Sequence, residues 1–241
     1  MKTLFITGTD TGIGKTTVAA SMCAFLSIRK NLNIGVMKPF ESGIAKRNKD
    51  LLPWDAICLR EASCSTDDLD DINPYMFEAP LAPEVAADLE HIQIDLDIVD
   101  KIYRKIAKNH DIVVVEGAGG VLVPIKKDFF YADLIERWAT PAIIISRIGL
   151  GTINHTLLTC KYLESRGASI IGVILNNNDG TDDLAAQTNF EALSRHINVP
   201  ILGVFPHFKG LLKEGMNRNL LADIFAKNID TETMMERIEK M

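Results

Sequence analysis

The sequence has little of what a disulfide-stabilised or secreted protein needs. Its 241 residues contain four cysteines, none of which forms a C-x-x-C pair or lies at metal-ligand spacing from a histidine. We therefore expect reduced thiols in a cytoplasmic protein. The first residues lack the apolar stretch and the small-residue cleavage site of a signal peptide, and no apolar run approaches membrane-spanning length, so we expect no membrane association.

Runs of basic residues are also missing. The net charge is −6 and no stripe of Lys or Arg forms, so we expect no nucleic-acid partner. The hydrophobic fraction of 47% is enough for one large core, and we expect a single domain over residues 1–241. Residues 64–83 are polar and contain proline, which predicts a loop above the sheet, and the charged, amphipathic residues 217–241 predict one or two surface helices with a frayed end.

Short apolar runs alternate with helical patterns along the chain. Ile112-Val-Val-Val115 is one such run, and continuous apolarity favours strands that are buried on both faces, as in a parallel sheet. The alternation predicts a three-layer α/β/α P-loop NTPase fold with a mainly parallel central sheet. The predicted strands cover residues 4–7, 34–37, 112–115, 142–145, 170–175 and 200–204, and the predicted helices cover residues 15–30, 95–108, 132–138, 152–166 and 184–196.

The strongest chemical signal is the glycine-rich segment Gly8-Thr-Asp-Thr-Gly-Ile-Gly-Lys-Thr16, between a predicted strand and a predicted helix. Glycines let the backbone approach phosphates, and the N–H groups at the helix start face the anion. Lys15 would add positive charge at the β and γ phosphates, and the Thr16 hydroxyl would ligate Mg²⁺. The segment therefore predicts binding of Mg²⁺-ATP, although Gly8 and Gly14 are separated by one residue more than in the common G-x-x-x-x-G-K-[ST] motif.

Two charged residues follow other predicted strands. Glu116 stands where the run 112–115 stops, before Gly-Ala-Gly-Gly, and would face a ligand at the carboxyl edge of the sheet. The alternative is an exposed loop carboxylate. Lys38 ends the strand at 34–37 and would lie over the same edge; the alternative is an ordinary surface lysine.

Two further segments are candidates for the site but also have purely structural explanations. Asp55 is a candidate for the Mg²⁺ side of the site, but it also reads as the N-cap of a helix at residues 56–60. The segment Gly149–His155 opens a helix whose N–H groups suit a carboxylate. Its alternative is a helix start that Thr152 or Asn154 caps.

Together these motifs resemble the dethiobiotin synthetase family, the ATP-dependent cyclo-ligases of biotin synthesis. The longer phosphate loop is a feature of that family. The match runs to about residue 209, and its motifs are G-T-D-T-x-x-G-K-T at Gly8–Thr16, K-P-x-x-S-G at Lys38–Gly43, Asp55, N-P-Y at Asn73–Tyr75, V-E-G-A-G-G at Val115–Gly120 and G-x-I-N-H at Gly151–His155.

The resemblance implies a reaction. One amine of 7,8-diaminopelargonic acid and CO₂ would give a carbamate, and ATP with Mg²⁺ would phosphorylate the carbamate to a carbamic-phosphoric mixed anhydride. The second amine would then close the ureido ring of dethiobiotin, with release of ADP and phosphate. The resemblance also implies a homodimer with the diamine at the subunit interface.

The resemblance further implies roles for single residues. Lys15, Lys38 and Thr11 would act at the reacting groups. Thr16, Asp55 and Glu116 would hold Mg²⁺. The diamine would contact Ser42, Thr152, Ile153 and Asn154, the last three partly from the neighbouring chain. ATP would contact Gly12, Ile13, Gly14, Lys15, Thr16, Thr17, Asp55, Glu116, Gly117, Ala118, Gly119, Asn176, Asn177, Phe205, Pro206 and His207, and His207 stands where many relatives carry Trp.

Two rival interpretations come from related proteins. ATPase switches of the partitioning or septum-positioning type share the fold, but they carry a signature lysine early in the loop, where this chain has Thr9, Asp10 and Thr11. They also lack the turn at residues 38–42. Synthetases that amidate cobyrinate usually carry a glutaminase domain, for which 241 residues leave no room.

Overall fold

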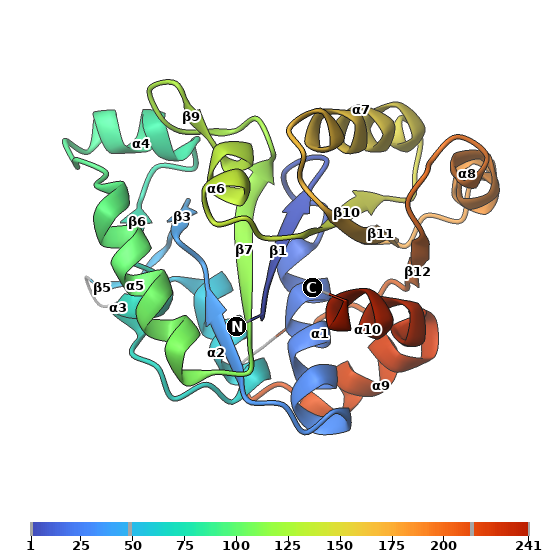
Figure 1. Ribbon diagram of the computed structural model, residues 1–241, viewed down its shortest axis with the longest axis horizontal. Coiled ribbons are helices and arrows are strands. Elements are labelled where there is room, and N and C mark those ends of the chain that lie inside the picture. Colours follow the sequence, from blue (N-terminus) through green and yellow to red (C-terminus); the bar gives the residue numbers. More distant parts are fainter. Residues whose placement is uncertain (1, 48–49, 213–214, 241) are drawn as a thin grey trace.

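A six-stranded sheet crosses the computed structural model, which describes residues 2–47, 50–212 and 215–240 (Figure 1). Its strand order is β12-β11-β10-β1-β7-β2, and every neighbouring pair is parallel. Each of the six predicted strands lies in this sheet, so the predicted fold class is confirmed. The strands are β1 (Lys2–Gly8), β2 (Ile34–Met37), β7 (Ile112–Gly120), β10 (Ala142–Arg147), β11 (Ile170–Asn176) and β12 (Ile201–Phe205).

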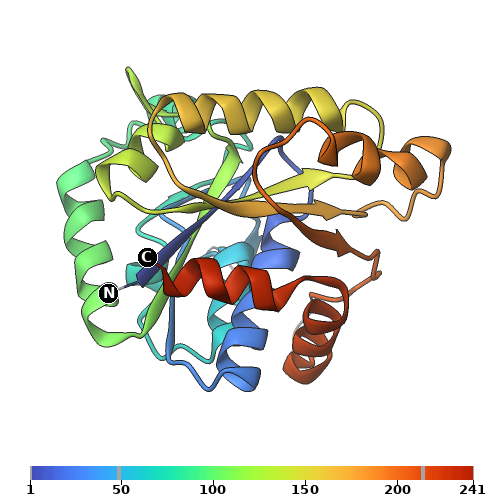
Figure 2. The same cartoon turned by 45° about the vertical axis from the view of Figure 1, so that its right-hand side comes forward.

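Helices cover both faces of the sheet, which is why the strands are continuously apolar (Figures 1 and 2). In β1, Leu4 and Ile6 face one core and Phe5 faces the other. The first face is covered by α1 (Lys15–Arg29), α2 (Trp54–Ser63), α9 (Arg218–Asn228) and α10 (Thr231–Glu239), and the second by α5 (Leu96–Asn109), α6 (Tyr131–Arg137), α7 (Thr152–Ser165) and α8 (Leu184–Ser194).

The segment at residues 64–83 is more regular than the predicted loop. It contains the helix α3 (Leu69–Ile72) and the strand β6 (Tyr75–Phe77), and β6 pairs in parallel with β3 (Phe40–Ser42). This pairing holds the residues that follow β2 against the rest of the molecule. The remaining short elements are α4 (Pro83–Leu89), β4 (Lys46–Arg47), β5 (Asp50–Leu51), β8 (Pro124–Lys126) and β9 (Phe129–Phe130).

Two predicted helix caps are wrong. The helix predicted at residues 56–60 begins earlier, as α2, with Pro53 at the N-cap position, and this places Asp55 inside the first turn. α7 begins after Gly151, whose φ of 91° is left-handed, so neither Thr152 nor Asn154 caps it. In both cases a residue with a fixed or unusual backbone conformation sets the helix start.

Residues 218–240 are part of the core rather than a surface tail, and the predicted helices exist as α9 and α10. α9 packs on α1, where the rings of Phe25 and Phe225 have centroids 5.6 Å apart, and α10 packs on β11 and β12. Met234 and Ile238 are fully buried.

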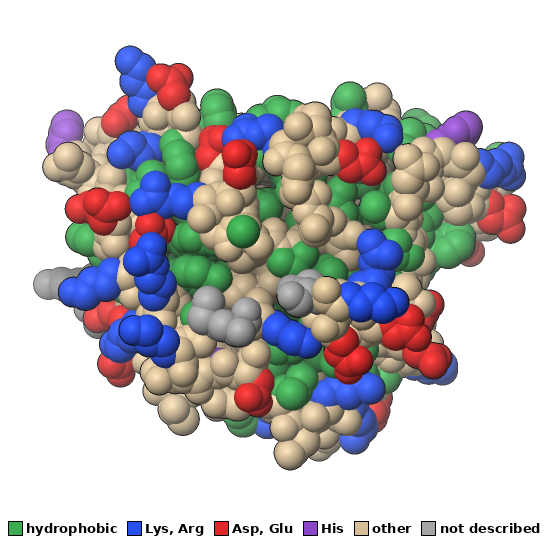
Figure 3. Space-filling view, in the orientation of Figure 1, with side chains coloured by type: hydrophobic (Ala, Val, Ile, Leu, Met, Phe, Trp, Pro, Cys, Tyr) green, Lys and Arg blue, Asp and Glu red, His purple; other side chains and the backbone are tan. Residues whose placement is uncertain are grey.

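The exposed surface is mixed in character. On the face drawn in Figure 3, basic and acidic side chains are interspersed among apolar ones, as expected from the net charge of −6. Within the described ranges, the helices are too short or too polar to cross a membrane.

Gly203 in β12 provides a test of how closely α9 packs against the sheet. Its φ is 146°, and a Cβ there would lie 2.2 Å from the carbonyl oxygen of Asn228, which is a backbone atom of α9. We expect Gly203→Ala to lower the free energy of unfolding by more than about 2 kcal/mol, as measured by urea unfolding followed by circular dichroism.

Gly167→Ala is the matched control. Gly167 also has a left-handed φ, 71°, but no atom lies within 4 Å of its ideal Cβ position. This variant should therefore show only the conformational cost of about 1 kcal/mol. If the free energy of unfolding fell equally in the two variants, α9 would have shifted to make room for the new methyl group.

Candidate active site

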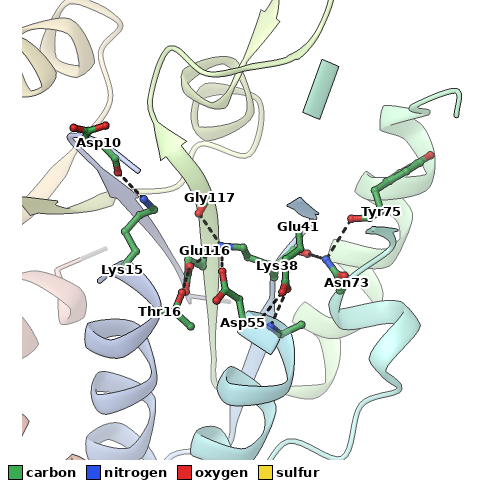
Figure 4. Close-up of polar contacts among 11 residues, drawn as sticks. Asp10, Lys15, Thr16, Lys38, Glu41, Asp55, Asn73, Tyr75, Glu116 and Gly117 are labelled. Atoms are coloured by element: carbon green, nitrogen blue, oxygen red, sulfur yellow. Dashed lines mark hydrogen bonds and ion pairs between the residues drawn. The ribbon is translucent and has the colours of Figure 1, made fainter. Parts of the chain in front are cut away.

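The candidate site lies at the carboxyl edge of the sheet, where the loops after β1, β2 and β7 meet (Figure 4). Lys15 and Thr16 begin α1, Lys38 follows β2, Asp55 lies in the first turn of α2 and Glu116 lies within β7. The structure therefore brings together five residues that the sequence predicts for one site.

The glycine loop has the backbone that phosphate binding needs. Gly14 has a φ of 82°, and a Cβ there would lie 2.2 Å from Nδ2 of Asn176, so a larger residue would be strained and would displace the Asn176 amide. The loop is held from outside, because Asn176 Nδ2 donates to the carbonyl oxygen of Ile13 at 2.7 Å and Asn178 Nδ2 donates to that of Gly12 at 3.1 Å. The N–H groups at the start of α1 can thus face an anion.

Lys15 is buried at the end of this loop, and no carboxylate of the described residues forms an ion pair with it. Its Nζ donates to the carbonyl oxygen of Asp10 at 2.8 Å. Burial and the positive charge of Lys38 lower the pKa of Lys15 to about 8. The carboxylate of Asp10 itself forms an ion pair with Arg147 at the end of β10, a residue that sequence reasoning did not select.

Lys38 has the opposite surroundings. Its Nζ lies 2.6 Å from Glu116 Oε1 and 3.0 Å from Asp55 Oδ2, and it donates to the carbonyl oxygen of Gly117 at 3.2 Å. Burial alone would lower the pKa of Lys38, but the two carboxylates raise it above its usual value, so this ammonium stays charged. Lys38 and Glu116 are 2% and 0% exposed, and the alternatives of a surface lysine and an exposed loop carboxylate are therefore wrong.

The backbone of Lys38 is held by the end of α3. Its N–H donates to the carbonyl oxygen of Ile72 at 2.7 Å, and Asn73 Nδ2 donates to the carbonyl oxygen of Lys38 at 2.6 Å. Asn73 is completely buried. Sequence reasoning noted Asn73 only as part of the N-P-Y motif, because its partner lies 35 residues away in the chain.

Glu41 is a second residue that sequence reasoning missed. Its carboxylate accepts hydrogen bonds from the backbone N–H groups of Asp55 at 2.9 Å and Ala56 at 3.1 Å. Burial and the nearby charge of Asp55 raise the pKa of Glu41 to about 7. No pattern near position 41 signals this role, since its partners are in α2.

The residues around Glu116 fit a hard divalent cation. Thr16 Oγ1 donates to Glu116 Oε1 at 2.8 Å, and the side chain of Asp55 also bonds to Thr16. Glu116 Oε2 is buried with no hydrogen-bond partner in the described chain. The described residues contain no cluster of three or more His, Cys, Asp or Glu side chains that would hold a metal alone. Two carboxylates and a hydroxyl instead suit Mg²⁺, which keeps waters and binds substrate phosphates.

The residues predicted to bind the diamine are more dispersed. Ser42 is half-buried at the end of β3, near the turn that carries Lys38. Thr152 is buried, and its hydroxyl bonds to that of Ser146 at 2.8 Å, which in turn reaches Thr9 at 3.1 Å. Asn154 is exposed, Ile153 is half-buried, and Thr11 lies exposed in the loop.

The residues predicted near the adenine gather beside the loop from the ends of β11 and β12. Asn177 donates to the carbonyl oxygen of Thr181 at 2.9 Å, and its N–H donates to that of Phe205 at 2.9 Å. The Phe205 ring is buried in the core, so only its backbone faces this region. His207 bonds to the carbonyl oxygen of Asn178 at 2.9 Å and Pro206 precedes it, while Thr17 lies in α1 and Gly117, Ala118 and Gly119 belong to β7.

Comparisons with known proteins support one family. A family described as AAA domain matches residues 2–215. The ATP-dependent dethiobiotin synthetase of Thermodesulfovibrio yellowstonii is 37% identical over 239 residues, covering 96% of this chain and 97% of that protein. That of Bacillus subtilis strain 168 is 41% identical over 214 residues (89% and 91%), and that of Methanocaldococcus jannaschii is 40% identical over 206 residues (83% and 92%).

Solved structures show the same fold at low identity. The MinD cell division protein of Aquifex aeolicus has a TM-score of 0.55 and 19% identity, with 100% of this chain and 96% of that chain covered. A ParA family ATPase from Chlorobium tepidum has a TM-score of 0.55 and 15% identity (100% and 99%), and apo McdA of Cyanthece has 0.59 and 15% (99% and 99%). These likenesses concern the fold alone.

The parallel sheet, the glycine loop and the match to the AAA domain family define a protein of the P-loop NTPase class. Within that class, the chain belongs to the ATP-dependent dethiobiotin synthetase family, as its identities over nearly the whole length show. It is therefore an ATP-dependent ligase of biotin biosynthesis, and the rival interpretations as a partitioning ATPase or a cobyrinate-amidating synthetase are wrong.

The lowered pKa of Lys15 predicts a pH dependence of ATP binding. Below pH of about 8 the ammonium is already protonated in the free protein. Above it, the free protein has lost a proton that the phosphate-bound state keeps, so affinity for ATP should fall as pH rises. Isothermal titration calorimetry from about pH 7 to about pH 9, in two buffers of different ionisation enthalpy, should show proton uptake on binding at the upper end.

Lys15→Arg is the control, because a guanidinium stays charged throughout this range. Its ATP affinity should vary less with pH than that of the wild type. A wild-type affinity that is constant to about pH 9, without proton uptake, would contradict the lowered pKa.

Proposed function

We propose that this chain closes the ureido ring of dethiobiotin from 7,8-diaminopelargonic acid, CO₂ and ATP with Mg²⁺, within one domain that spans residues 1–241. The observation that carries this proposal is the buried ammonium of Lys38, which lies 2.6 Å from Glu116 and 3.0 Å from Asp55 beside the phosphate loop. Such a fixed positive charge suits an anionic acceptor of a phosphoryl group, and a carbamate is such an acceptor.

The chemistry proceeds in three steps. One amine of the diamine forms a C–N bond with CO₂ and loses a proton, which gives the carbamate. A carbamate oxygen then attacks the γ phosphorus of ATP, and the bond to ADP breaks. Finally the second amine attacks the carbonyl carbon of the mixed anhydride, the C–O bond to the phosphoryl group breaks, and phosphate leaves with the proton of the amine as the ring closes.

The two lysines stabilise the negative charge that these steps create. Lys15, at the end of the loop, faces the β and γ phosphates, and Lys38 faces the carbamate and the transferring phosphoryl group. The exposed position of Thr11 in the loop allows it to contact the reacting groups. Ser42, beside Lys38, contacts the diamine.

Thr16, Asp55 and Glu116 would hold Mg²⁺, and Glu116 Oε2, which has no hydrogen-bond partner among the described residues, supports this. The ion would neutralise charge on the β and γ phosphates. Asn176, Asn177, Pro206 and His207 form the adenine side of the site.

We also propose a homodimer with the diamine at its interface. Leu150 and Leu158, before and within α7, are 85% and 61% exposed, and Leu122 is 52% exposed. Leu150 lies two residues before the start of α7, where Thr152, Ile153 and Asn154 would receive the carboxylate of the diamine. Large exposed apolar side chains beside a binding site are typical of an interface, and we expect a second copy of the chain to cover them.

The activity is tested by phosphate release. We expect release from ATP to require both diaminopelargonate and bicarbonate as the source of CO₂, with dethiobiotin detected by mass spectrometry. Omission of either substrate is the control. Turnover of ATP that ignores both compounds would refute the proposed reaction.

The role of Lys38 is tested by Lys38→Gln, which keeps much of the side-chain volume and removes the charge. We expect kcat to fall about 100-fold or more, because a fixed charge at the transferring group is lost. The circular dichroism spectrum should remain native. Lys105→Gln, in a lysine whose side chain is 60% exposed on α5, is the control and should keep normal turnover; near-normal kcat for Lys38→Gln would exclude the role.

A further inference from the structure

We propose that Glu41 is a positioning residue, which fixes Asp55 in the active site by capping α2 from the neighbouring strand β3. This inference rests on the proposed function, since it concerns how one proposed Mg²⁺ ligand is held. Glu41 is only 6% exposed, yet no step of the reaction uses its carboxylate. A buried carboxylate without a chemical task calls for a structural reason.

The two oxygens of Glu41 supply that reason. Oε1 accepts from the N–H of Asp55 at 2.9 Å, and Oε2 accepts from the N–H of Ala56 at 3.1 Å. These N–H groups belong to the first turn of α2, where a helix offers no internal acceptor. The N-cap residue is Pro53, whose side chain has no oxygen to offer. Because Ala56 is fully buried, its N–H has no access to water and would be unpaired without Glu41.

This cap differs from the other side-chain caps described in the chain. Asp95, Asp183, Asn217 and Asp230 each cap the helix that immediately follows them. Glu41 instead reaches α2 from 14 residues earlier in the chain. A distant cap fixes the position of a helix start relative to another element, which a local cap does not do.

Glu41 lies only three residues after Lys38, in the short segment that runs from the end of β2 into β3 (Figure 4). Lys38 Nζ contacts Asp55 Oδ2 at 3.0 Å, while Glu41 holds the backbone of the same Asp55. Asn73 in turn fixes the backbone of Lys38. One short segment therefore sets both the backbone and the carboxylate of Asp55, and this leaves Asp55 poised beside Thr16.

Glu41 is not itself a further metal ligand. Both of its oxygens are engaged by backbone N–H groups, whereas Glu116 keeps Oε2 without a partner among the described residues. A cation at Glu41 would have to displace two hydrogen bonds of a buried helix end. The three neighbouring carboxylates thus have different tasks, and that of Glu41 is to hold Asp55.

The test compares Glu41→Ala with Asp230→Ala. Asp230 caps α10 with two hydrogen bonds to Thr233 at 3.0 and 2.7 Å, so both variants lose a helix cap with two bonds. We expect both to lower Tm, but only Glu41→Ala to raise the Mg²⁺ concentration for half-saturation, by about 10-fold or more. That constant is measured in substrate-dependent phosphate release and, independently of turnover, as the Mg²⁺ dependence of ADP binding in calorimetry.

An unchanged Mg²⁺ constant in a folded Glu41→Ala protein would overturn the proposal, as would an equal rise in Asp230→Ala. If Glu41→Ala does not fold, Glu41→Gln serves, because it keeps one acceptor oxygen and replaces the other by a donor. It should raise the same constant about fivefold, and no rise would again overturn the proposal. The proposed function fails separately, if the wild type releases phosphate without regard to diaminopelargonate and bicarbonate.

Discussion

The site depends on the buried ammonium of Lys38. A charge removed from water is tolerated only when opposite charges and hydrogen bonds replace the lost solvent, and removal of one partner leaves a costly uncompensated charge. Here the partners are Glu116 at 2.6 Å, Asp55 at 3.0 Å and the carbonyl oxygen of Gly117 at 3.2 Å. Glu116 and Gly117 belong to β7, and Asp55 belongs to α2. The end of β2, the middle of β7 and the start of α2 must therefore be placed accurately relative to one another, which constrains the loops that join them.

Strand register provides most of that precision. β2 and β7 are parallel neighbours, with Met37 opposite Val115. Lys38 directly follows Met37 and Glu116 directly follows Val115, so a register shift by one residue would separate the ion pair. The apolar residues before them specify the register, because they must remain buried between helices on both faces. The same residues thus stabilise the fold and align its charges.

Sequence patterns identified the candidate site residues but not all of the residues that fix their positions. The six strands, the glycine loop, Lys38 and Glu116 were predictable, because continuous apolar runs and the residues at their ends are local features. Glu41 and Asn73 were not, since each bonds to backbone groups 14 or 35 residues away. The alternative interpretation assigned Asp55 as an N-cap because aspartate is a common capping residue. In the structure α2 begins earlier, after Pro53, and its backbone N–H groups are capped by Glu41 from β3.

The two lysines of the site are both buried, but their pKa values shift in opposite directions. Lys38 contacts carboxylates, which raise its pKa, so it is charged whether or not a ligand is bound. Lys15 contacts the carbonyl oxygen of Asp10 and lies near Lys38, and its pKa is lowered to about 8. A phosphate would supply the negative charge that Lys15 lacks and would raise its pKa again. In the proposed reaction, Lys38 is therefore the preorganised charge for the carbamate, whereas Lys15 keeps its charge above pH of about 8 only when the nucleotide is bound.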